Sequence, residues 1–335
     1  MHRARLLRLI LLSFLIVSAA GCGRIGNVYL SASLTDTYLA AANDSALTAK
    51  EAYLIVMDYQ NRYNHYYAQT GISDFWNTEV AGTTFSEYLK EKRLREEVCA
   101  LLLLDDMAKE NDLSLDESEI NTCQEAAAAY YSGLNDAERA FCQAKETDVQ
   151  SLYEKYRLAQ KMIASMTDGV YLEISDNDKR VITVQIISVS DASQAESLKQ
   201  SLQSGADFQT AAKEYSSLSK IEYQVSRGML SPALEDVAFY LADGEMSDVI
   251  ESEGHYFLIK CIDDFDEALS EANEDQVYRS SLYEQWGPQL EAFAAQSEVS
   301  FREKLWDQLS FYETDAMPDY NLYEIYDQYF PVKQG

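Results

Sequence analysis

Helix-start signals recur through the first half of this 335-residue chain and constrain its fold more than any other feature. A Ser or Thr followed three residues later by Glu or Gln satisfies two backbone N–H groups at the start of a helix. The pattern occurs as Thr48 with Glu51, Thr84 with Glu87, Ser114 with Glu117 and Thr147 with Gln150, and Asn135 with Glu138 is a weaker version. Their recurrence predicts a helical domain over residues 48–168.

The periodicity changes after a polar, turn-rich segment at residues 169–180, which we interpret as a linker. The run VITVQIISV at residues 181–189 is apolar and β-branched, which is typical of a strand. Asp191 can cap the helix that follows, and Ser231 before a proline marks a later helix start. The elements follow the order β-α-α-β-α-β-β over residues 181–263, which predicts a small α+β domain.

Helical patterns return over residues 267–335, and the tail YNLYEIYDQYFP is rich in aromatic residues. So many exposed rings would favour aggregation, so we expect them to pack against another helix. Residues 267–335 should therefore fold back onto residues 48–168. The predicted fold class is α+β: a discontinuous all-helical domain, made of N- and C-terminal helices, with the smaller α+β domain inserted into it.

The first 21 residues resemble a bacterial lipoprotein signal peptide. Three arginines precede an apolar segment that ends in SAAGC, and this segment is shorter than the roughly 20 residues of a membrane-spanning helix. The resemblance implies cleavage before Cys22 and a diacylglyceryl group on its sulfur. Residues 22–47 would then be an anchor and tether, with one candidate strand at residues 27–34. An ordinary cleaved signal peptide with an incidental cysteine is the alternative.

The formal net charge of −29 argues against nucleic acid as a partner, because phosphate binding needs clustered Lys and Arg. It argues equally against binding to anionic lipid through a basic patch. The acidic run DDFDE at residues 263–267 is interpreted as a solvated exit from the α+β domain, because its spacing fits no calcium-binding loop.

Four cysteines follow Cys22 in the chain: Cys99, Cys123, Cys142 and Cys261. We interpret them as small apolar core residues, and a Cys99–Cys123 or a Cys123–Cys142 disulfide stays open. The chain has no CxxC pair and only three histidines, so we expect no zinc site and no cofactor.

Residues 181–263 resemble a parvulin, the small peptidyl-prolyl isomerase domain of the PpiC or rotamase type. The segments that carry the resemblance are GADFQTAAKEYS, SRGMLSPALEDVAFYLADGEMSDVIES and YFLIKC. The order of lipid anchor, helices, parvulin-like domain and returning helices is similar to that of the SurA/PrsA-type extracytoplasmic foldases. This resemblance implies a foldase or chaperone on the extracytoplasmic face of the bacterial cell membrane.

Parvulins are understood to use two facing histidines, a nearby Cys or Asp and an apolar floor beneath the proline. By resemblance, the first-strand histidine corresponds to Gln185 and the last-strand histidine to Phe257, with His255 as a possible substitute. Leu230 and Leu234 correspond to the apolar floor. The acid and glycine-rich loop of the family are replaced by SSLSKIEYQVS. Gln185 either binds the backbone of a client or satisfies a neighbouring strand, and Leu230 and Leu234 are either pocket floor or plain core.

The sequence therefore predicts a foldase with weak or absent isomerase activity, whose partners are unfolded or proline-containing secreted polypeptides. A holdase that cradles such chains without catalysis is included in this prediction. The alternatives are a fully active peptidyl-prolyl isomerase and a purely structural or binding lipoprotein. The oligomeric state stays open.

Overall fold

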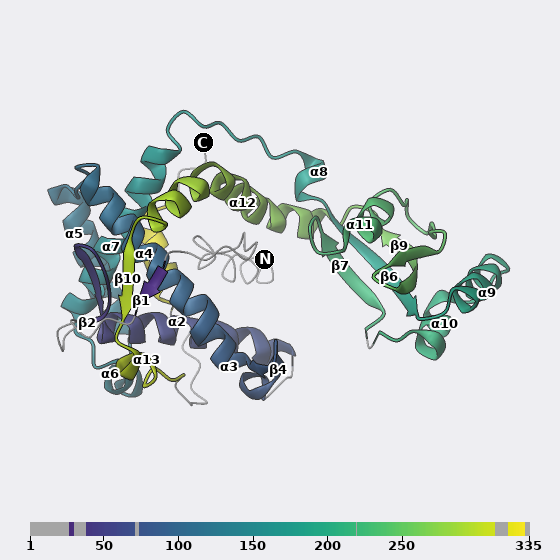
Figure 1. The fold of residues 1–335 in the computed structure, drawn as a ribbon, viewed down its shortest axis with the longest axis horizontal. Helices are drawn as coiled ribbons and strands as arrows, with labels where there is room; N and C mark the ends of the chain where they lie inside the picture. The colour runs from purple at the N-terminus through teal and green to yellow at the C-terminus, as the bar shows by residue number, and fades with distance from the viewer. Residues whose placement is uncertain (1–26, 30–37, 71–73, 219, 312–320, 332–335) are drawn as a thin grey trace. The chain divides into compact units, whose positions relative to one another are not determined.

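The computed structural model describes residues 27–29, 38–70, 74–218, 220–311 and 321–331. These residues divide into two compact units (Figure 1). One comprises residues 172–279, and the other comprises the described residues before 172 and after 279. The first unit is thus inserted into the sequence of the second. The predicted signal peptide and Cys22 lie outside the described residues.

The inserted unit follows the predicted order β-α-α-β-α-β-β, which is confirmed. Its elements are α8 (Asp176–Lys179), β6 (Val181–Val189), α9 (Ala192–Gln203), α10 (Phe208–Tyr215), β7 (Glu222–Ser226), α11 (Pro232–Ala238), β8 (Ile250–Ser252) and β9 (His255–Asp263). The four strands form one antiparallel sheet in the order β7-β6-β9-β8. As predicted, Asp191 caps α9, because its carboxylate accepts the backbone N–H of Gln194 at 2.8 Å.

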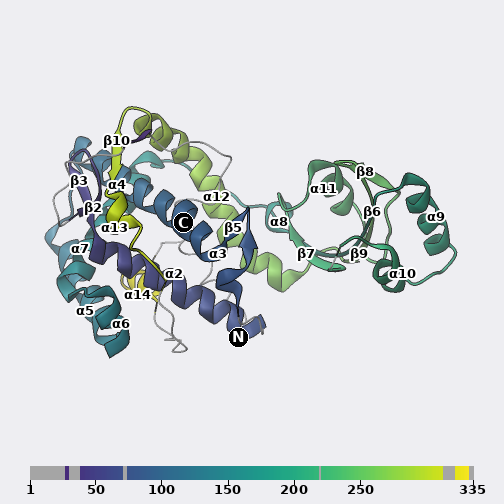
Figure 2. The ribbon, with the colours of Figure 1, turned by 60° about the horizontal axis from the view of Figure 1, so that its bottom comes forward.

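Helix α11 lies on one side of the sheet and α9 and α10 lie on the other (Figure 2), with an apolar cluster on each side. On one side, α9 and α10 cover Ile187, Val189 and Leu258. On the other side, α11 covers Ile186 and Ile259. Because side chains alternate along a strand, neighbours in β6 point to opposite clusters.

The second unit is built mainly from helices around one large core. They are α2 (Ala49–Thr70), η2 (Phe75–Asn77), α3 (Phe85–Tyr88), the π-helical η3 (Leu89–Leu94), α4 (Arg95–Glu110), α5 (Glu117–Gly133), α6 (Asp136–Cys142), α7 (Glu146–Met166), α12 (Glu267–Ala294), α13 (Glu303–Trp306) and α14 (Leu322–Tyr329). The long helix α12 begins in the inserted unit and ends in this one.

The predicted helix starts agree with the structure to different degrees. The Thr48–Glu51 and Asn135–Glu138 pairs form both of their expected hydrogen bonds, and Thr84 accepts the N–H of Glu87. The other two starts differ by two residues. Helix α5 is capped by Asp116 with Glu119 instead of Ser114 with Glu117. At α7, the N–H of Lys145 bonds to the carboxylate of Asp148.

The expectation that this unit is all-helical is wrong. Six strands lie within it: β1 (Asn27–Tyr29), β2 (Tyr38–Ala42), β3 (Ser45–Thr48), β4 (Glu79–Val80), β5 (Thr83–Thr84) and β10 (Glu298–Phe301). Four of them form a sheet in the order β1-β10-β2-β3, and β4 pairs with β5. Residues 38–47, predicted as tether, instead form the β2–β3 hairpin against α4, with Leu39 and Leu47 fully buried. β1 covers the first three residues of the candidate strand at residues 27–34, and residues 30–34 lie outside the described residues.

The returning C-terminal helices pack on the N-terminal helices, as predicted. The segment after α12 is fixed to α4 by Arg95. Its guanidinium lies 4.6 Å from the Phe301 ring and 4.5 Å from the Trp306 ring, and it makes two 3.1 Å hydrogen bonds to the carboxylate of Glu303. The indole N–H of Trp306 bonds to Glu91 at 2.8 Å. Residues from both ends of the chain therefore share one core.

The four described cysteines are buried and free, so neither disulfide that stayed open forms. Burial raises the pKa of the Cys99 and Cys123 thiols to about 12 and that of Cys261 to about 11. Thiols of this kind are poor nucleophiles and agree with a core role. Among the described residues, no helix combines the length and the apolar character needed to cross a bilayer.

Candidate functional site

The α11 side of the inserted sheet brings together three of the residues predicted for the site. Leu234 on α11 is buried, and Leu230, which precedes this helix, is half-buried. Both belong to the cluster that Phe257 of β9 joins. The turn before α11 is fixed by Glu235, whose carboxylate accepts the N–H of Gly228 at 2.6 Å. Gly228 has φ of +81°, a conformation that strongly favours glycine.

Gln185 does not join this group. In β6 it lies opposite Glu222 of β7 and Lys260 of β9, and directly opposed residues point to the same face of a sheet. That face is the one covered by α9 and α10. The Gln185 amide donates to the Glu222 carboxylate at 3.1 Å. Gln185 therefore satisfies a neighbouring strand, and its assignment to the pocket is a correction.

Ile186 takes the position that was predicted for Gln185. It is buried, pairs with Ile259, and belongs to the same cluster as Leu230, Leu234 and Phe257. The error is one residue, which in a strand reverses the face. The alternation of side chains along the strand was the available signal. In the observed register Ile186, and not Gln185, lies on the same face as Phe257.

His255 lies at the start of β9 and is exposed. It is on the same face as Phe257, and the two ring centroids are 6.4 Å apart. It pairs with Ser252 of β8, whose hydroxyl is 2.9 Å from the hydroxyl of Ser231 at the start of α11. His255 and the hydroxyl groups of Ser231 and Ser252 thus lie at the border of the apolar cluster. His255 does not lie within the cluster.

The segment SSLSKIEYQVS, residues 216–226, replaces the acidic loop of the parvulin family and is hydrogen-bonded to the sheet. The backbone N–H of Ser217 donates to the carbonyl of Ser188 at 2.8 Å, and Leu218 packs against the α11-side cluster. Among its described residues, Glu222 is the one acid, and its carboxylate holds Gln185. The segment therefore adds apolar surface to this face and no acid.

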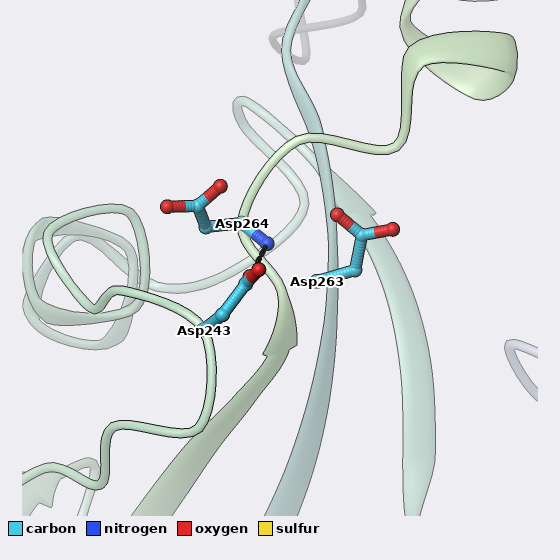
Figure 3. A group of neighbouring side chains, drawn as sticks. All are labelled: Asp243, Asp263 and Asp264. Atoms are coloured by element: carbon cyan, nitrogen blue, oxygen red, sulfur yellow. Dashed lines mark hydrogen bonds between the residues drawn. The ribbon is translucent and has the colours of Figure 1, made fainter.

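Three aspartates gather at the end of β9, the last strand of the inserted sheet. Asp263 and Asp264 follow Cys261 at the end of β9, and Asp243 lies on the adjoining loop (Figure 3). One carboxylate oxygen of Asp243 accepts the N–H of Asp264 at 2.7 Å. This carboxylate is thus engaged by the backbone of the turn. The group is an exposed to half-buried cluster at a domain exit.

A polar cluster that the sequence did not predict lies in the core of the helical unit. The Glu97 carboxylate of α4 accepts hydrogen bonds from the hydroxyls of Tyr59 at 2.7 Å, Tyr156 at 2.5 Å, and Tyr323. Burial raises the pKa of Glu97 to about 7, while the tyrosine hydroxyls act in the opposite direction. The sequence signal was weak, because the four residues come from four separate helices.

The α11-side face is mainly apolar where its side chains meet. Its described floor is aliphatic and aromatic, and the single imidazole near it is that of His255 at the rim. Twisting a peptide bond is opposed by a barrier of about 18–20 kcal/mol. A site without positioned polar groups lowers that barrier mainly by excluding water and holding the ring.

Comparison with known proteins agrees with this geometry. The family model of the PPIC-type PPIase (rotamase) domain matches residues 188–263. The foldase protein PrsA of Caldanaerobacter subterraneus subsp. tengcongensis is 26% identical over 208 residues, which are 58% of this chain and 63% of that protein. Foldase protein PrsA 2 of Bacillus anthracis is 25% identical over 192 residues, 55% of this chain and 66% of that protein.

Among solved structures, the peptidylprolyl isomerase PrsA from Bacillus cereus is 18% identical. The match covers 77% of this chain and 99% of that chain, with a TM-score of 0.37. The chain spans slightly less than two thirds of the curated relatives it matches. Residues 188–263 are thus a PPIC-type domain, and the predicted resemblance to PrsA-type foldases is confirmed.

Proposed function

We propose that this chain is an extracytoplasmic foldase that binds unfolded or proline-containing segments of secreted polypeptides and has weak or no isomerase activity. The observation that carries the proposal is the apolar α11-side face of the rotamase domain. Ile186, Leu230, Leu234 and Phe257 meet there, and two of them, Ile186 and Phe257, are apolar where the resemblance to parvulins implies histidines.

The chemistry of prolyl isomerisation supports this division between binding and catalysis. An X–Pro bond has nearly balanced isomers but interconverts in tens of seconds or longer. Catalysis requires groups that favour the twisted amide over the planar one. Apolar side chains contact the proline ring equally in both states, so they contribute to client binding and little to rate.

A fully active isomerase is the second candidate. The specific observation in its favour is His255, which lies on the same face as Phe257 beside the hydrogen-bonded hydroxyls of Ser231 and Ser252. A client carbonyl at this rim would meet three protic groups.

A purely structural or binding lipoprotein is the third candidate, and it would show neither activity tested below.

Two assays on one preparation of residues 23–335 test the proposal. We expect little acceleration of cis-to-trans conversion in a proline tetrapeptide, because the one imidazole near the described floor of the cluster, that of His255, is exposed at its rim. We also expect suppression of aggregation of a reduced, unfolded secreted protein at a near-stoichiometric ratio.

Phe257→Ala should weaken binding of a proline peptide several-fold, whereas Gln185→Ala, on the opposite face, should not.

Each result separates the candidates. Acceleration equal to that of a histidine-bearing parvulin, lost in His255→Ala, would establish the active isomerase instead. No suppression of aggregation at several-fold excess would remove the chaperone function. Equal effects of Phe257→Ala and Gln185→Ala would show that the α11-side face is not where clients bind.

We also propose that Cys22 carries the lipid that holds the chain on the extracytoplasmic face of the cell membrane. The support is the arginine-led apolar segment and the SAAGC sequence before this cysteine. We expect Cys22→Ala to move most of the protein from the membrane fraction to the soluble extracytoplasmic fraction. Unchanged membrane association of this variant would contradict the anchor.

A further inference from the structure

The hairpin at the rim of the α11-side face carries an exposed carboxylate. Glu253 lies in the turn between Ser252 of β8 and His255 of β9, which pair with each other. Its φ of +52° is that of a tight two-residue hairpin turn. The carbonyl oxygen of Glu253 is 3.4 Å from Nδ1 of the His255 imidazole. Glu253 therefore lies directly beside the imidazole and hydroxyl groups of this rim.

The stretch of chain that forms the rim is uniformly acidic. Residues 228–259, which include α11, β8 and the first half of β9, contain no Lys or Arg. Their seven acidic residues are Glu235, Asp236, Asp243, Glu245, Asp248, Glu251 and Glu253. A charge distribution of one sign attracts cationic groups and repels anionic ones, and so contributes to the choice of partner.

Four of these carboxylates are already engaged. Those of Glu235, Asp243 and Glu245 accept backbone N–H groups at 2.6, 2.7 and 3.0 Å. The carboxylate of Asp248 forms an ion pair with Lys199 at 2.7 Å. The other three carboxylates have no hydrogen-bond or ion-pair partner among the described residues. These three belong to Asp236, Glu251 and Glu253.

Of these three residues, Glu253 is the one beside the rim. Asp236 is two positions along α11 from the buried Leu234, which places it on the opposite side of that helix. Glu251 pairs with Tyr256, whose side chain packs on the cluster under α9 and α10. Glu251 and Glu253 thus carry equal charges on one hairpin, but Glu251 points to the other face of the sheet.

Two bases contact residues of the α11 side, and both have other partners. The Lys220 ammonium lies 5.2 Å from the Tyr223 ring of β7, and β6 and β9 separate this strand from β8. The Arg227 guanidinium is 3.8 Å from the Glu235 carboxylate. A client can therefore bring the cation that the Glu253 carboxylate lacks.

We propose that Glu253 selects clients that carry an Arg or Lys next to the proline, because its carboxylate pairs with that cation while the α11-side face holds the proline ring. This inference rests on the proposed function, since it requires clients to bind this face. His255 lies between the face and the turn, with its ring centroid 6.4 Å from that of Phe257, so the cation has to be on a long side chain. Exposed ion pairs change affinity by less than about fivefold. The expected effect is therefore a preference among clients.

Three fluorescein-labelled peptides of equal length, each with one central proline, are the probes. One has Gln on both sides of the proline, one has Arg before it, and one has Arg after it. Their binding to residues 23–335 is measured by fluorescence anisotropy. We expect one of the Arg peptides to bind about threefold more tightly than the Gln peptide at about 0.1 M salt. The difference should disappear at about 1 M salt, where the Debye length falls from about 10 Å to about 3 Å.

Two variants with the same change in charge assign the preference. Glu253→Gln should abolish it, whereas Glu251→Gln, on the other face of the same hairpin, should keep it. A preference that persists in Glu253→Gln, or that both variants reduce equally, would overturn the proposal and assign the effect to the overall charge.

The peptides also separate this proposal from the function on which it rests. Equal binding of all three peptides, weakened by Phe257→Ala, would show that clients bind the α11-side face and that Glu253 does not select them. Binding of none of the peptides, or binding that Phe257→Ala leaves unchanged, would overturn the proposed client site and the selection by Glu253 together.

Discussion

Replacing Trp306 by alanine is expected to lower the free energy of unfolding of the helical unit by about 3–5 kcal/mol. The indole is 0% exposed, packs edge-on against Phe301 at 5.0 Å and lies under the Arg95 guanidinium. Its N–H also bonds to Glu91. The substitution removes the buried ring and loosens the attachment of the C-terminal segment to α4.

Denaturant unfolding followed by far-ultraviolet circular dichroism measures this effect. The two units need not unfold together, so amide exchange in α4 and α7 assigns the change to the helical unit. The matched control is Tyr171→Ala, because that ring is 83% exposed and its loss should change stability by less than about 0.5 kcal/mol. Equal effects of the two substitutions would show that the C-terminal segment is not held through Trp306.

The sequence predicted where helices lie better than where they begin. Thr48 and Asn135 were correct starts because each has one acidic partner at the required spacing. Near α5 the acidic residues are dense, so both Ser114 with Glu117 and Asp116 with Glu119 fit the rule. The structure uses Asp116. The capping rule fits both possible starts of α5, so it cannot decide between them. The packing of the helix decides which start is used.

The sheet of the helical unit was missed for a different reason. β2 and β3 read YLAAA and SALT, in which Tyr38 and Thr48 are the only aromatic or β-branched residues of the kind that favours strands. β3 pairs with β2, and the other partner of β2 is β10, whose Ser300 lies opposite Ala41 from the far end of the chain. These residues are strands because Leu39 and Leu47 fill the core, which is information that no local window contains.

The candidate site shows how small a sequence error can be and still matter. Motifs placed α11, Leu230, Leu234 and Phe257 correctly on one apolar face. The first strand was shifted by a single residue, so Gln185 was assigned where Ile186 lies. The correction makes the face more apolar than predicted. It therefore strengthens the expectation of binding with little catalysis.

The Glu97 cluster predicts an unusual dependence of stability on pH. The facing groups are Asp58, Tyr59 and Arg62 on α2, Tyr156 on α7 and Tyr323 on α14. Burial is the largest cause that raises the pKa of Glu97 from 4.5 to about 7. Between these two values the folded carboxyl keeps its proton while the unfolded one has lost it. Stability therefore falls as the pH rises through this window.

Glu97→Gln isolates this contribution because the amide is neutral at every pH and similar in size to the acid. The free energy of unfolding of the unsubstituted chain, relative to that of Glu97→Gln, should decrease by about 3 kcal/mol between pH 4.5 and pH 8. Urea unfolding of both chains at matched pH values measures it. Asp178→Asn is the control, because Asp178 is exposed and its pKa is lowered by hydrogen bonds from Ser175, so that its contribution changes only below this pH window and its relative stability should stay constant within it. A relative stability that stays constant from pH 4.5 to pH 8 would mean that Glu97 is already ionised in the folded state at pH 5. The three tyrosine hydroxyls would then outweigh the burial of the carboxylate.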